Sequence, residues 1–271
     1  MKALFSGIQP TGDIHIGNYF GAIANWVRIQ HDYVPFISIV DLHAITIPYE
    51  TAEMPKRVEE LALPLYACGF DLERTTLFVQ SEVPGHADLT WIFNTITPLG
   101  ELERMTQFKD KREQFRATVN AGLLDYPVLQ AADILIYKGE VVPVGQDQKQ
   151  HVEVTRDIAI KFNTDYADAI REAGIEDGQF FVPPEPYITG PATRVMSLRD
   201  GTKKMSKSDP SDLSRLNLTD DTDTIAKKIR KAKTDPEPLP PWVWRERHPP
   251  KPAAQGALSP EAAITRQEER R

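Results

Sequence analysis

The chain has 271 residues, a net charge of −7 and one cysteine, Cys68. Its length suits one large domain or a core domain with a smaller one, and no uncharged apolar run is long enough to cross a bilayer. A single cysteine excludes an intrachain disulfide and a cysteine-rich metal site, and the acidic balance argues against a protein held to nucleic acid by bulk electrostatics.

Short apolar runs alternate with helical patterns along most of the chain. The apolar runs predict buried strands at residues 3–6, 36–40, 76–80 and 141–144. The helical patterns cover residues 16–29, 55–68, 89–97, 128–137 and 148–162. Strands that alternate with helices predict a parallel sheet in an α/β fold.

The turn after the first predicted strand has features of a phosphate site. It runs from Gly7 to Gly12, and a helix is expected to begin within residues 14–17, so backbone N–H groups and the helix dipole could face phosphate. His15 and Asn18 lie on one face of the first helical turn, and both can donate hydrogen bonds. Asn18 and Tyr19 stand where a P-loop needs Lys and Ser or Thr, so a P-loop is rejected. A turn that merely starts a helix remains the alternative.

The character of the sequence changes at residues 181–209, where prolines, glycines and polar residues predict a long, mobile loop. Within it, Lys204 and Lys207 are interleaved with Met205, Ser206 and Ser208. Two lysines on a mobile loop could close over a polyphosphate and neutralise charge on a departing pyrophosphate. A solvated basic loop is the alternative. Residues 222–233 are again helical, and the proline-rich residues beyond 235 predict a largely disordered tail.

A third feature is the lone carboxylate of Asp133, which lies among apolar residues and small alanines in a predicted helix. A carboxylate that faces the core is costly unless it meets a donor, and an indole N–H would be such a donor. A ligand without that N–H would leave the carboxylate unpaired and would be rejected. An Asp133 that faces solvent is the alternative.

Several segments resemble a known family. Two segments are similar to the two signature motifs of class I aminoacyl-tRNA synthetases, namely His15-Ile16-Gly17-Asn18 and Lys204-Met205-Ser206-Lys207-Ser208. The first motif ends in Asn18, a form that is similar to the motif of tryptophanyl enzymes. The likeness to tryptophanyl-tRNA synthetases runs from Met1 to about residue 240 and is strongest at residues 5–10, 40–46, 100–109, 131–135 and 142–151.

The resemblance implies an α/β fold, with a Rossmann-like parallel sheet, flanking helices and a partial helical C-terminal region. It implies a catalytic domain at residues 1–210 with a helical insertion at about 86–140, and the start of a helical anticodon-binding region at 211–235. Residues 236–271 are an atypical tail whose segment from Pro241 onward has no counterpart in the family, and a frameshift or a truncation of the C-terminus is expected. Charging of tRNA by this chain would then be impaired.

The resemblance also implies roles for individual residues. The predicted catalytic side chains are His15, Asn18, Lys111, Lys204 and Lys207. ATP would be contacted by Gln9, Pro10, Thr11, Gly17, Asn18, Gly145, Gln146, Asp147, Val195, Lys204, Met205, Ser206, Lys207 and Ser208. Tryptophan would be held by Phe5, Gly7, Val40, His43, Tyr126, Asp133 and Gln148, although His43 could instead be a core histidine with satisfied hydrogen bonds. No protein metal ligand is expected, since Mg²⁺ would arrive with ATP and be held mostly by its phosphates and water.

The implied activity is the joining of L-tryptophan to tRNA(Trp), driven by ATP. The resemblance also implies a homodimer that works in the cytoplasm and does not associate with a membrane. Three alternatives stay open at this point. The chain could be a tyrosyl-tRNA synthetase, a defective fragment that binds ATP without aminoacylation, or another nucleotidyltransferase such as a pantothenate synthetase. Asp133 and residues 100–109 argue against the last of these.

Overall fold

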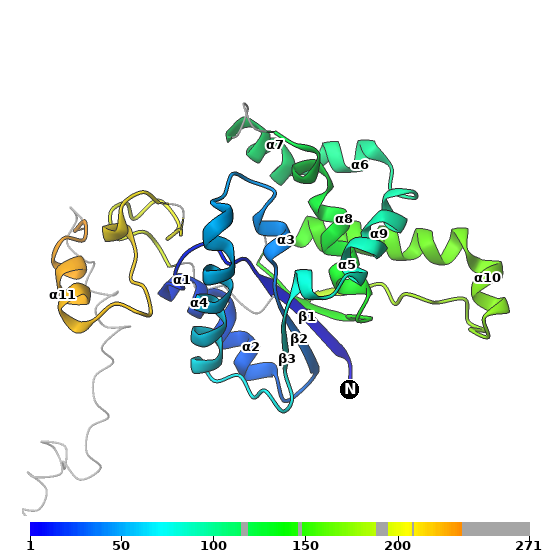
Figure 1. The fold of residues 1–271 in the computed structure, drawn as a ribbon, viewed down its shortest axis with the longest axis horizontal. Helices are drawn as coiled ribbons and strands as arrows, with labels where there is room; N and C mark the ends of the chain where they lie inside the picture. The colour runs from blue at the N-terminus through cyan, green and yellow to red at the C-terminus, as the bar shows by residue number, and fades with distance from the viewer. Residues whose placement is uncertain (115–118, 146–147, 188–194, 208, 235–271) are drawn as a thin grey trace, which may run out of the picture. The chain divides into compact units, whose positions relative to one another are not determined.

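The computed structural model describes residues 1–114, 119–145, 148–187, 195–207 and 209–234. The chain divides into two compact units, Met1–Ala232 and Lys233–Arg271, and the first holds every helix and strand of the described ranges (Figure 1). The tail expected at residues 236–271 lies outside these ranges, as do the predicted site residues Gln146, Asp147 and Ser208.

A five-stranded parallel sheet forms the centre of this unit, in the order β3-β2-β1-β4-β5. The strands are β1 (Ala3–Ile8), β2 (Val34–Ile39), β3 (Thr76–Val79), β4 (Val141–Pro143) and β5 (Glu185–Tyr187). Phe5 is paired with Phe36, which in turn is paired with Thr76. The predicted α/β fold with a parallel sheet is therefore confirmed.

The edge strand β5 was not expected, because it falls in residues 181–209, which we predict as a loop. It has three residues, and Glu185 pairs with Val141 of β4. A segment with proline at its centre and glutamate at its start has no strand pattern, yet proline is tolerated where one side of the strand has no partner. The expectation of a continuous loop is therefore wrong for these residues.

Helices follow most of the strands, with bounds that differ from the predicted ones. They are α1 (Ile16–Asn18), a π-helical turn η1 (Tyr19–Ile23), α2 (Ala24–Ile29), α3 (Asp41–Ala44), α4 (Met54–Ala67), α5 (Gly85–Asn94), α6 (Leu99–Arg104), α7 (Thr106–Gln114), α8 (Ala121–Leu135), α9 (Lys149–Asp165), α10 (Ala167–Glu172) and α11 (Thr222–Arg230). Short 3₁₀ turns are η2 (Thr51–Glu53), η3 (Gln80–Glu82) and η5 (Asp212–Ser214). The predicted helix at residues 16–29 is thus one helical run interrupted by a π-helical turn.

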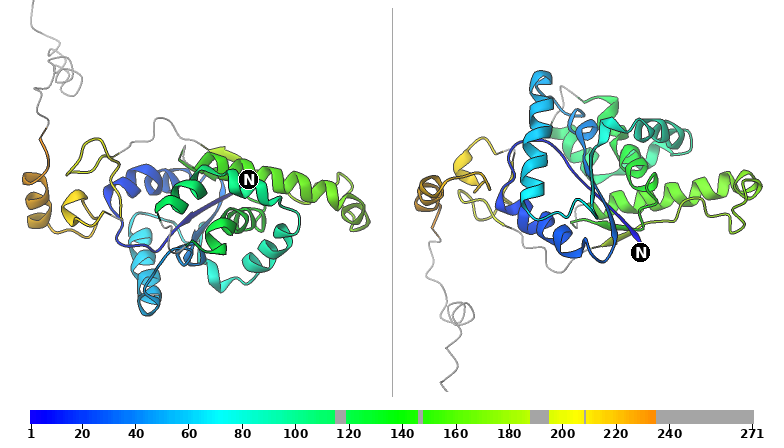
Figure 2. Two further views of the ribbon diagram at one scale, coloured as in Figure 1. Left: turned by 90° about the horizontal axis from the view of Figure 1, so that it is seen from above. Right: turned by 60° about the horizontal axis from the view of Figure 1, so that its bottom comes forward.

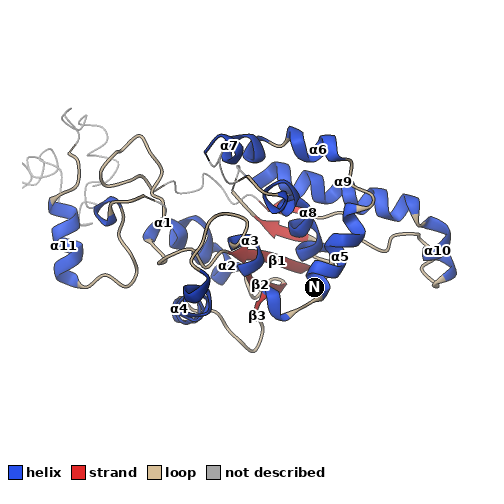
Figure 3. Cartoon of the chain, turned by 45° about the horizontal axis from the view of Figure 1, so that its top comes forward, coloured by secondary structure: helices blue, strands red, loops and turns tan. Residues whose placement is uncertain are grey.

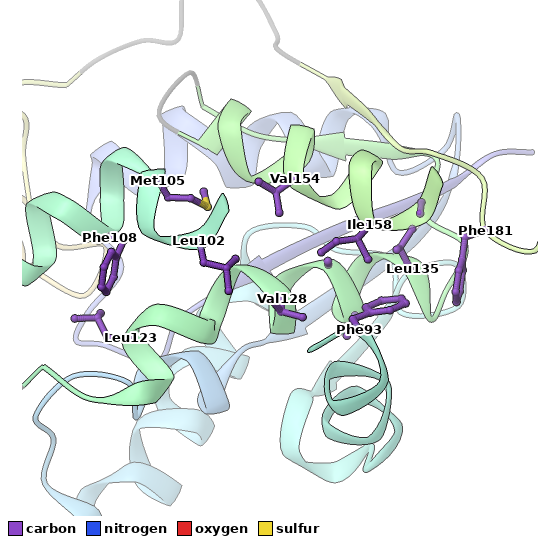
Figure 4. Packing of buried hydrophobic residues seen from close by; sticks show 13 residues of the cluster. Phe93, Leu102, Met105, Phe108, Leu123, Val128, Leu135, Val154, Ile158 and Phe181 are labelled. Atoms are coloured by element: carbon purple, nitrogen blue, oxygen red, sulfur yellow. The ribbon is translucent and has the colours of Figure 1, made fainter. Parts of the chain in front are cut away.

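Hydrophobic side chains cover both faces of the sheet. Because successive side chains of a strand point to opposite faces, Leu4 packs with Trp26 of α2 and Leu65 of α4, whereas Phe5 packs with Ile134 of α8. Figure 3 shows the strands with α2 and α4 on one side and α8 and α9 on the other. A further cluster joins the helices α5 to α9, and Figure 4 shows its side chains gathered between them.

The segment that precedes α11 is tied to the start of α1. The Ile16 N–H donates to the Leu216 carbonyl at 2.9 Å, and the Leu218 N–H donates to the Ile14 carbonyl at 2.8 Å. Figure 2 shows this segment, in yellow, beside the blue helix α1. Two segments about two hundred residues apart in the sequence therefore meet at one end of the sheet.

Candidate functional site

The carboxyl ends of four parallel strands meet at one edge of the sheet. Immediately after these ends stand Gln9, Val40, Gln80 and Val144. Ligands of open α/β sheets bind outside this edge. The edge is therefore where a ligand site is expected.

His15 and Asn18 fix each other at the start of α1. The Asn18 N–H donates to His15 Nδ1 at 3.3 Å, and the His15 N–H donates to Asn18 Oδ1 at 3.2 Å. Because His15 Nδ1 accepts a hydrogen bond, the neutral ring carries its proton on Nε2. Each side chain thus keeps donor groups, Nε2–H in His15 and the amide NH₂ in Asn18, as the sequence predicted.

Burial and neighbouring cations keep His15 neutral. The side chain is 2% exposed, and desolvation, followed by the positive charges of Lys207, Arg215 and Lys204, lowers the pKa of His15 to about 4. At neutral pH the ring is therefore a neutral hydrogen-bond donor close to three cationic side chains. Such a region attracts an anion.

The lysine-bearing segment, residues 195–207, packs directly on the first turn of α1. A side chain at Gly17 would lie 2.9 Å from the His15 ring and 3.6 Å from Met205 Cβ, so the position requires glycine. Met205 itself is buried, and its N–H donates to the Val195 carbonyl at 2.9 Å. Met196 and Lys204 form an antiparallel bridge, so these residues make a tight turn within the predicted loop. The structure therefore brings together the two segments that we singled out from the sequence.

Lys207 is partly withdrawn from solvent. Burial lowers its pKa to about 8, against the opposing negative charge of Asp13. Lys204, in contrast, is exposed. A cation whose desolvation is already partly complete interacts more strongly with an anion than an exposed one does.

A cavity of about 310 Å³ lies at the same edge of the sheet and reaches the turn after β1 at Gln9. It is lined by all seven residues predicted to hold tryptophan, namely Phe5, Gly7, Val40, His43, Tyr126, Asp133 and Gln148. Gln9, Lys111 and Gly145, which we predicted on the nucleotide side, line it as well. Gly7 permits this shape, because a side chain there would lie 2.8 Å from Val40 Cγ1.

Asp133 is the shared acceptor of a buried hydrogen-bond network. It is 1% exposed, so the alternative of a solvent-facing carboxylate is wrong. His43 Nε2 lies 2.8 Å from its Oδ2, while Gln80 Nε2 and His86 Nδ1 each lie 2.7 Å from its Oδ1. Burial alone would raise the pKa of Asp133, but the hydrogen bonds from His43 and His86 outweigh it and hold that pKa below its usual range. The group is thus an anion.

Gln80, His86 and Tyr137 were not foreseen from the sequence. The Tyr137 hydroxyl lies 2.8 Å from His86 Nε2, which extends the network to the end of α8. One signal was present, since Gln80 ends the predicted strand at residues 76–80 and so had to lie at the ligand-binding edge. His43 proves to be both a hydrogen-bonded core histidine and a cavity wall.

Tyr126 and Lys111 also line the cavity, and the Tyr126 ring lies 6.1 Å from the His43 ring, centre to centre. The Lys111 ammonium lies 4.4 Å from the centre of the Tyr126 ring, and the Tyr126 hydroxyl lies 2.8 Å from His151 Nε2. Burial lowers the pKa of Lys111 and raises the pKa of Tyr126. The phenol therefore stays protonated, and a partly desolvated cation faces the cavity.

The other predicted residues of the described ranges lie in the turn after β1 and in residues 195–207. Gln9, Pro10 and Thr11 form the turn between β1 and α1, where the Thr11 N–H donates to the Gln9 carbonyl at 2.9 Å. Val195 begins the lysine-bearing segment. Within the described ranges, no group of three or more His, Cys, Asp or Glu side chains could hold a metal, and no helix is long and apolar enough to span a membrane.

A second hollow, of about 580 Å³, lies between α3, α5 and the start of α8. Leu42, Ile45, Trp91 and Leu129 supply apolar wall, and Tyr126 is the one lining residue shared with the smaller cavity in the described part of the chain. Trp91 is 73% exposed. This hollow holds none of the cationic groups described above and is a surface feature rather than a reaction site.

Comparison with known proteins places these observations in context. Residues 1–245 match the family model for class I tRNA synthetases of tryptophan and tyrosine. A tryptophan–tRNA ligase from Rhizobium meliloti is 55% identical over 246 residues, which cover 88% of this chain and 70% of the relative. A tryptophanyl-tRNA synthetase structure from Mycoplasma pneumoniae superposes with a TM-score of 0.75 at 36% identity, covering 87% of this chain and 67% of that one. The Campylobacter jejuni enzyme, complexed with ADP and tryptophan, gives 0.74 at 35% identity, covering 88% and 69%.

Proposed function

The chain belongs to the class I family of tRNA synthetases for tryptophan and tyrosine, and from that premise we propose that it is a tryptophan–tRNA ligase. It activates L-tryptophan with ATP to tryptophanyl-adenylate and transfers the amino acid to tRNA(Trp). One observation carries this proposal: a buried, ionised carboxylate, Asp133, lines a cavity that Lys111 and Gln9 also line, beside the His15 turn. The relatives that match over most of the chain have the same specificity.

ATP binds along the edge formed by the first turn and the lysine-bearing segment. The donors of His15 and Asn18, which the mutual hydrogen bonds leave available, face the phosphates. Lys204 and Lys207 approach from the segment that packs on Gly17, and Lys111 approaches from α7. The nucleotide site is completed by Gln9, Pro10, Thr11, Gly145, Val195, Met205 and Ser206.

Tryptophan occupies the 310 Å³ cavity. Its indole N–H donates to Asp133, and Phe5, Gly7, Val40 and His43 surround the ring. Tyr126 and Gln148 orient the ammonium and carboxylate groups. A side chain that lacks the N–H would leave the carboxylate without its ligand donor, which costs about 1–3 kcal/mol.

The reaction proceeds in two steps that need no covalent enzyme nucleophile. The tryptophan carboxylate attacks the α-phosphate in line, and pyrophosphate leaves. A terminal ribose hydroxyl of the tRNA then attacks the carbonyl carbon of the mixed anhydride, and AMP leaves. The side chains of this protein position the two substrates and stabilise charge, chiefly through Lys111, Lys204 and Lys207. Mg²⁺, held by the ATP phosphates and water, would neutralise further phosphate charge.

The proposal extends to assembly and location. We expect a homodimer in the cytoplasm, with the larger hollow at the subunit contact, because Trp91 there is largely exposed in the single chain. Residues 1–210 would form the catalytic domain with its insertion at about 86–140, and residues 211–235 would begin the anticodon-binding region.

The test is ATP–pyrophosphate exchange driven by tryptophan, tyrosine or phenylalanine, run alongside charging of tRNA(Trp). Exchange with tryptophan alone is the expected result. Exchange with tyrosine alone would replace the proposal by a tyrosyl enzyme, and nucleotide binding without any exchange would identify a defective ATP-binding chain. Exchange accompanied by weak charging would agree with the impaired charging expected from the sequence.

A further inference from the structure

The hydrogen bonds around Asp133 leave it one acceptor position. A carboxylate offers about four lone-pair positions, two on each oxygen. Oδ1 already accepts from Gln80 Nε2 and His86 Nδ1, both at 2.7 Å, and Oδ2 accepts from His43 Nε2 at 2.8 Å. The remaining position is therefore on Oδ2.

The free position lies on the cavity side. Of the three donors, only His43 lines the cavity, whereas Gln80 and His86 are fully buried behind the carboxylate. The two buried donors hold Oδ1 away from the ligand, and Oδ2 lies on the side of His43. The carboxylate therefore presents a single, oriented acceptor to whatever fills the cavity.

His86 depends in turn on Tyr137. A ring that donates through Nδ1 to Asp133 has Nε2 as an acceptor when it is neutral, and the Tyr137 hydroxyl lies 2.8 Å from Nε2, where it can donate. The Tyr137 ring is itself stacked on Phe36, with centroids 4.8 Å apart. The carboxylate of Asp133 only accepts, so it places the proton of a neutral His86 on Nδ1, and the Tyr137 hydroxyl holds the ring by donating to Nε2.

We propose that His86, oriented by Tyr137, is a positioning residue that sets the selectivity for an indole N–H by keeping Oδ1 of Asp133 occupied and Oδ2 available. This inference rests on the proposed function and deepens it. Without the Nδ1 donor, Oδ1 is short of one partner, and the carboxylate gains freedom to turn or to take up a proton. Either change weakens acceptance from the indole more than it weakens packing of the ring.

The experiment compares tryptophan with 3-benzothienylalanine, in which sulfur replaces the indole N–H, as substrates for ATP–pyrophosphate exchange. The variants are His86→Leu, which removes both ring nitrogens; His86→Asn, whose amide can replace the Nδ1 donor; and Tyr137→Phe, which removes one hydroxyl from a half-buried ring. Tyr33→Phe is the matched control, because Tyr33 is a half-buried tyrosine of the other core cluster and lines neither cavity. The readout is the ratio of kcat/KM for the two amino acids.

The selectivity ratio of His86→Leu is expected to fall about tenfold, mainly through KM for tryptophan, with KM for ATP unchanged. His86→Asn should recover most of the ratio, Tyr137→Phe should give an intermediate value, and Tyr33→Phe should match the wild type. A substitution whose effect is only structural would lower kcat/KM for both amino acids equally. The ratio would then stay unchanged, and this result would overturn the inference. If His86→Leu fails to fold, an unchanged ratio in Tyr137→Phe overturns it as well. A wild type that shows no tryptophan-driven exchange refutes the proposed function instead, so the two failures are distinguishable.

Discussion

At the scale of single residues, Lys207 combines partial burial with a position beside the first turn. Its lowered pKa, about 8, means that the free enzyme loses this charge as the pH rises through 8, whereas an ordinary lysine would stay charged to about 10.4. A bound triphosphate favours the protonated form and would raise the pKa again. Lys207 is therefore most easily deprotonated in the free enzyme, before ATP binds.

We predict an alkaline decline in kcat/KM for ATP above pH 8, because that parameter reports the protonation states of the free enzyme. Lys207→Arg keeps its charge and should remove this decline, while Lys207→Met should lower kcat/KM about 100-fold at pH 7. Pyrophosphate exchange measured between about pH 6.5 and 9.5 checks both outcomes. Lys203→Met, which alters an exposed lysine of the same segment, should keep the wild-type profile. An unchanged alkaline decline in Lys207→Arg would assign it to another group.

The sequence predicted the residues of the two signature segments better than the surroundings of Asp133. His15, Asn18, Lys204 and Lys207 are local in the chain, so their order and spacing were enough to single them out. Gln80 and His86 reach Asp133 from 53 and 47 residues away, and only the strand order of the sheet brings them together. Hydrogen bonds between distant elements leave no periodic trace in a sequence.

At the scale of elements, α11 holds the base of the lysine-bearing segment. Lys228 is 1% exposed, and its ammonium lies 2.7 Å from carboxylate oxygens of both Asp212 and Asp220. Asn217 is bonded to the same two aspartates and forms a bridge with His15. A buried ion pair thus connects α11 with the first turn of the nucleotide site.

We predict that Lys228→Met weakens the use of ATP more than it weakens the binding of tryptophan. It removes the cation that Asp212 and Asp220 share and loosens the segment that carries Lys204 and Lys207. KM for ATP should rise and kcat should fall, each about tenfold, as expected when positioning is lost. Tryptophan binding, followed by its own titration, should be unchanged, because Lys228 does not line the tryptophan cavity.

The exposed neighbour Lys227 provides the control for this experiment, since Lys227→Met lies on the same helix without the ion pairs. Affinities for ATP and tryptophan that weaken together in Lys228→Met would show general unfolding rather than a local role. Thermal unfolding of both variants separates these cases.

The predictability of the elements depended on their burial pattern. The four predicted strands were found with ends within two residues, because each is a short apolar run in a parallel sheet. The helix predicted at 128–137 begins earlier, at Ala121, where Asn120 accepts from the Leu123 N–H, and continues through Pro127. Leu123 and Val128 on either side of Pro127 are fully buried, so tertiary packing outweighs the cost of proline.

At the scale of the whole molecule, the parallel sheet explains why predicted site residues from distant segments gather at one edge. The α/β class could be predicted because alternating strands and helices allow few topologies. The edge strand β5 and the helix α10 could not, since short or strongly polar segments have no distinctive pattern, and α6 and α7 were expected only through the helical insertion that the resemblance implies. The chain spans 70% of the length of the Rhizobium relative, and the predicted domain limits at 210 and 235 stay predictions.

The last prediction concerns association of two chains. The larger hollow presents Trp91, 73% exposed, and Ile45, 40% exposed, and an aromatic side chain of this exposure is typical of an interface anchor. Light scattering should give twice the 30.6 kDa of one chain, and Trp91→Glu should shift the protein toward monomer by burying a charge in the contact. Leu63→Glu is the matched control, because Leu63 is 71% exposed on α4 and does not line the hollow.

Association would also bear on catalysis. Tyr126 lines both the hollow and the tryptophan cavity, so a partner seated in the hollow would restrict the wall that faces the amino acid. Trp91→Glu should therefore raise KM for tryptophan severalfold at concentrations where it is monomeric, with a smaller effect on KM for ATP. A wild type that scatters as a monomer at micromolar concentration, or a Trp91→Glu protein that remains dimeric, would place the subunit contact elsewhere or remove it.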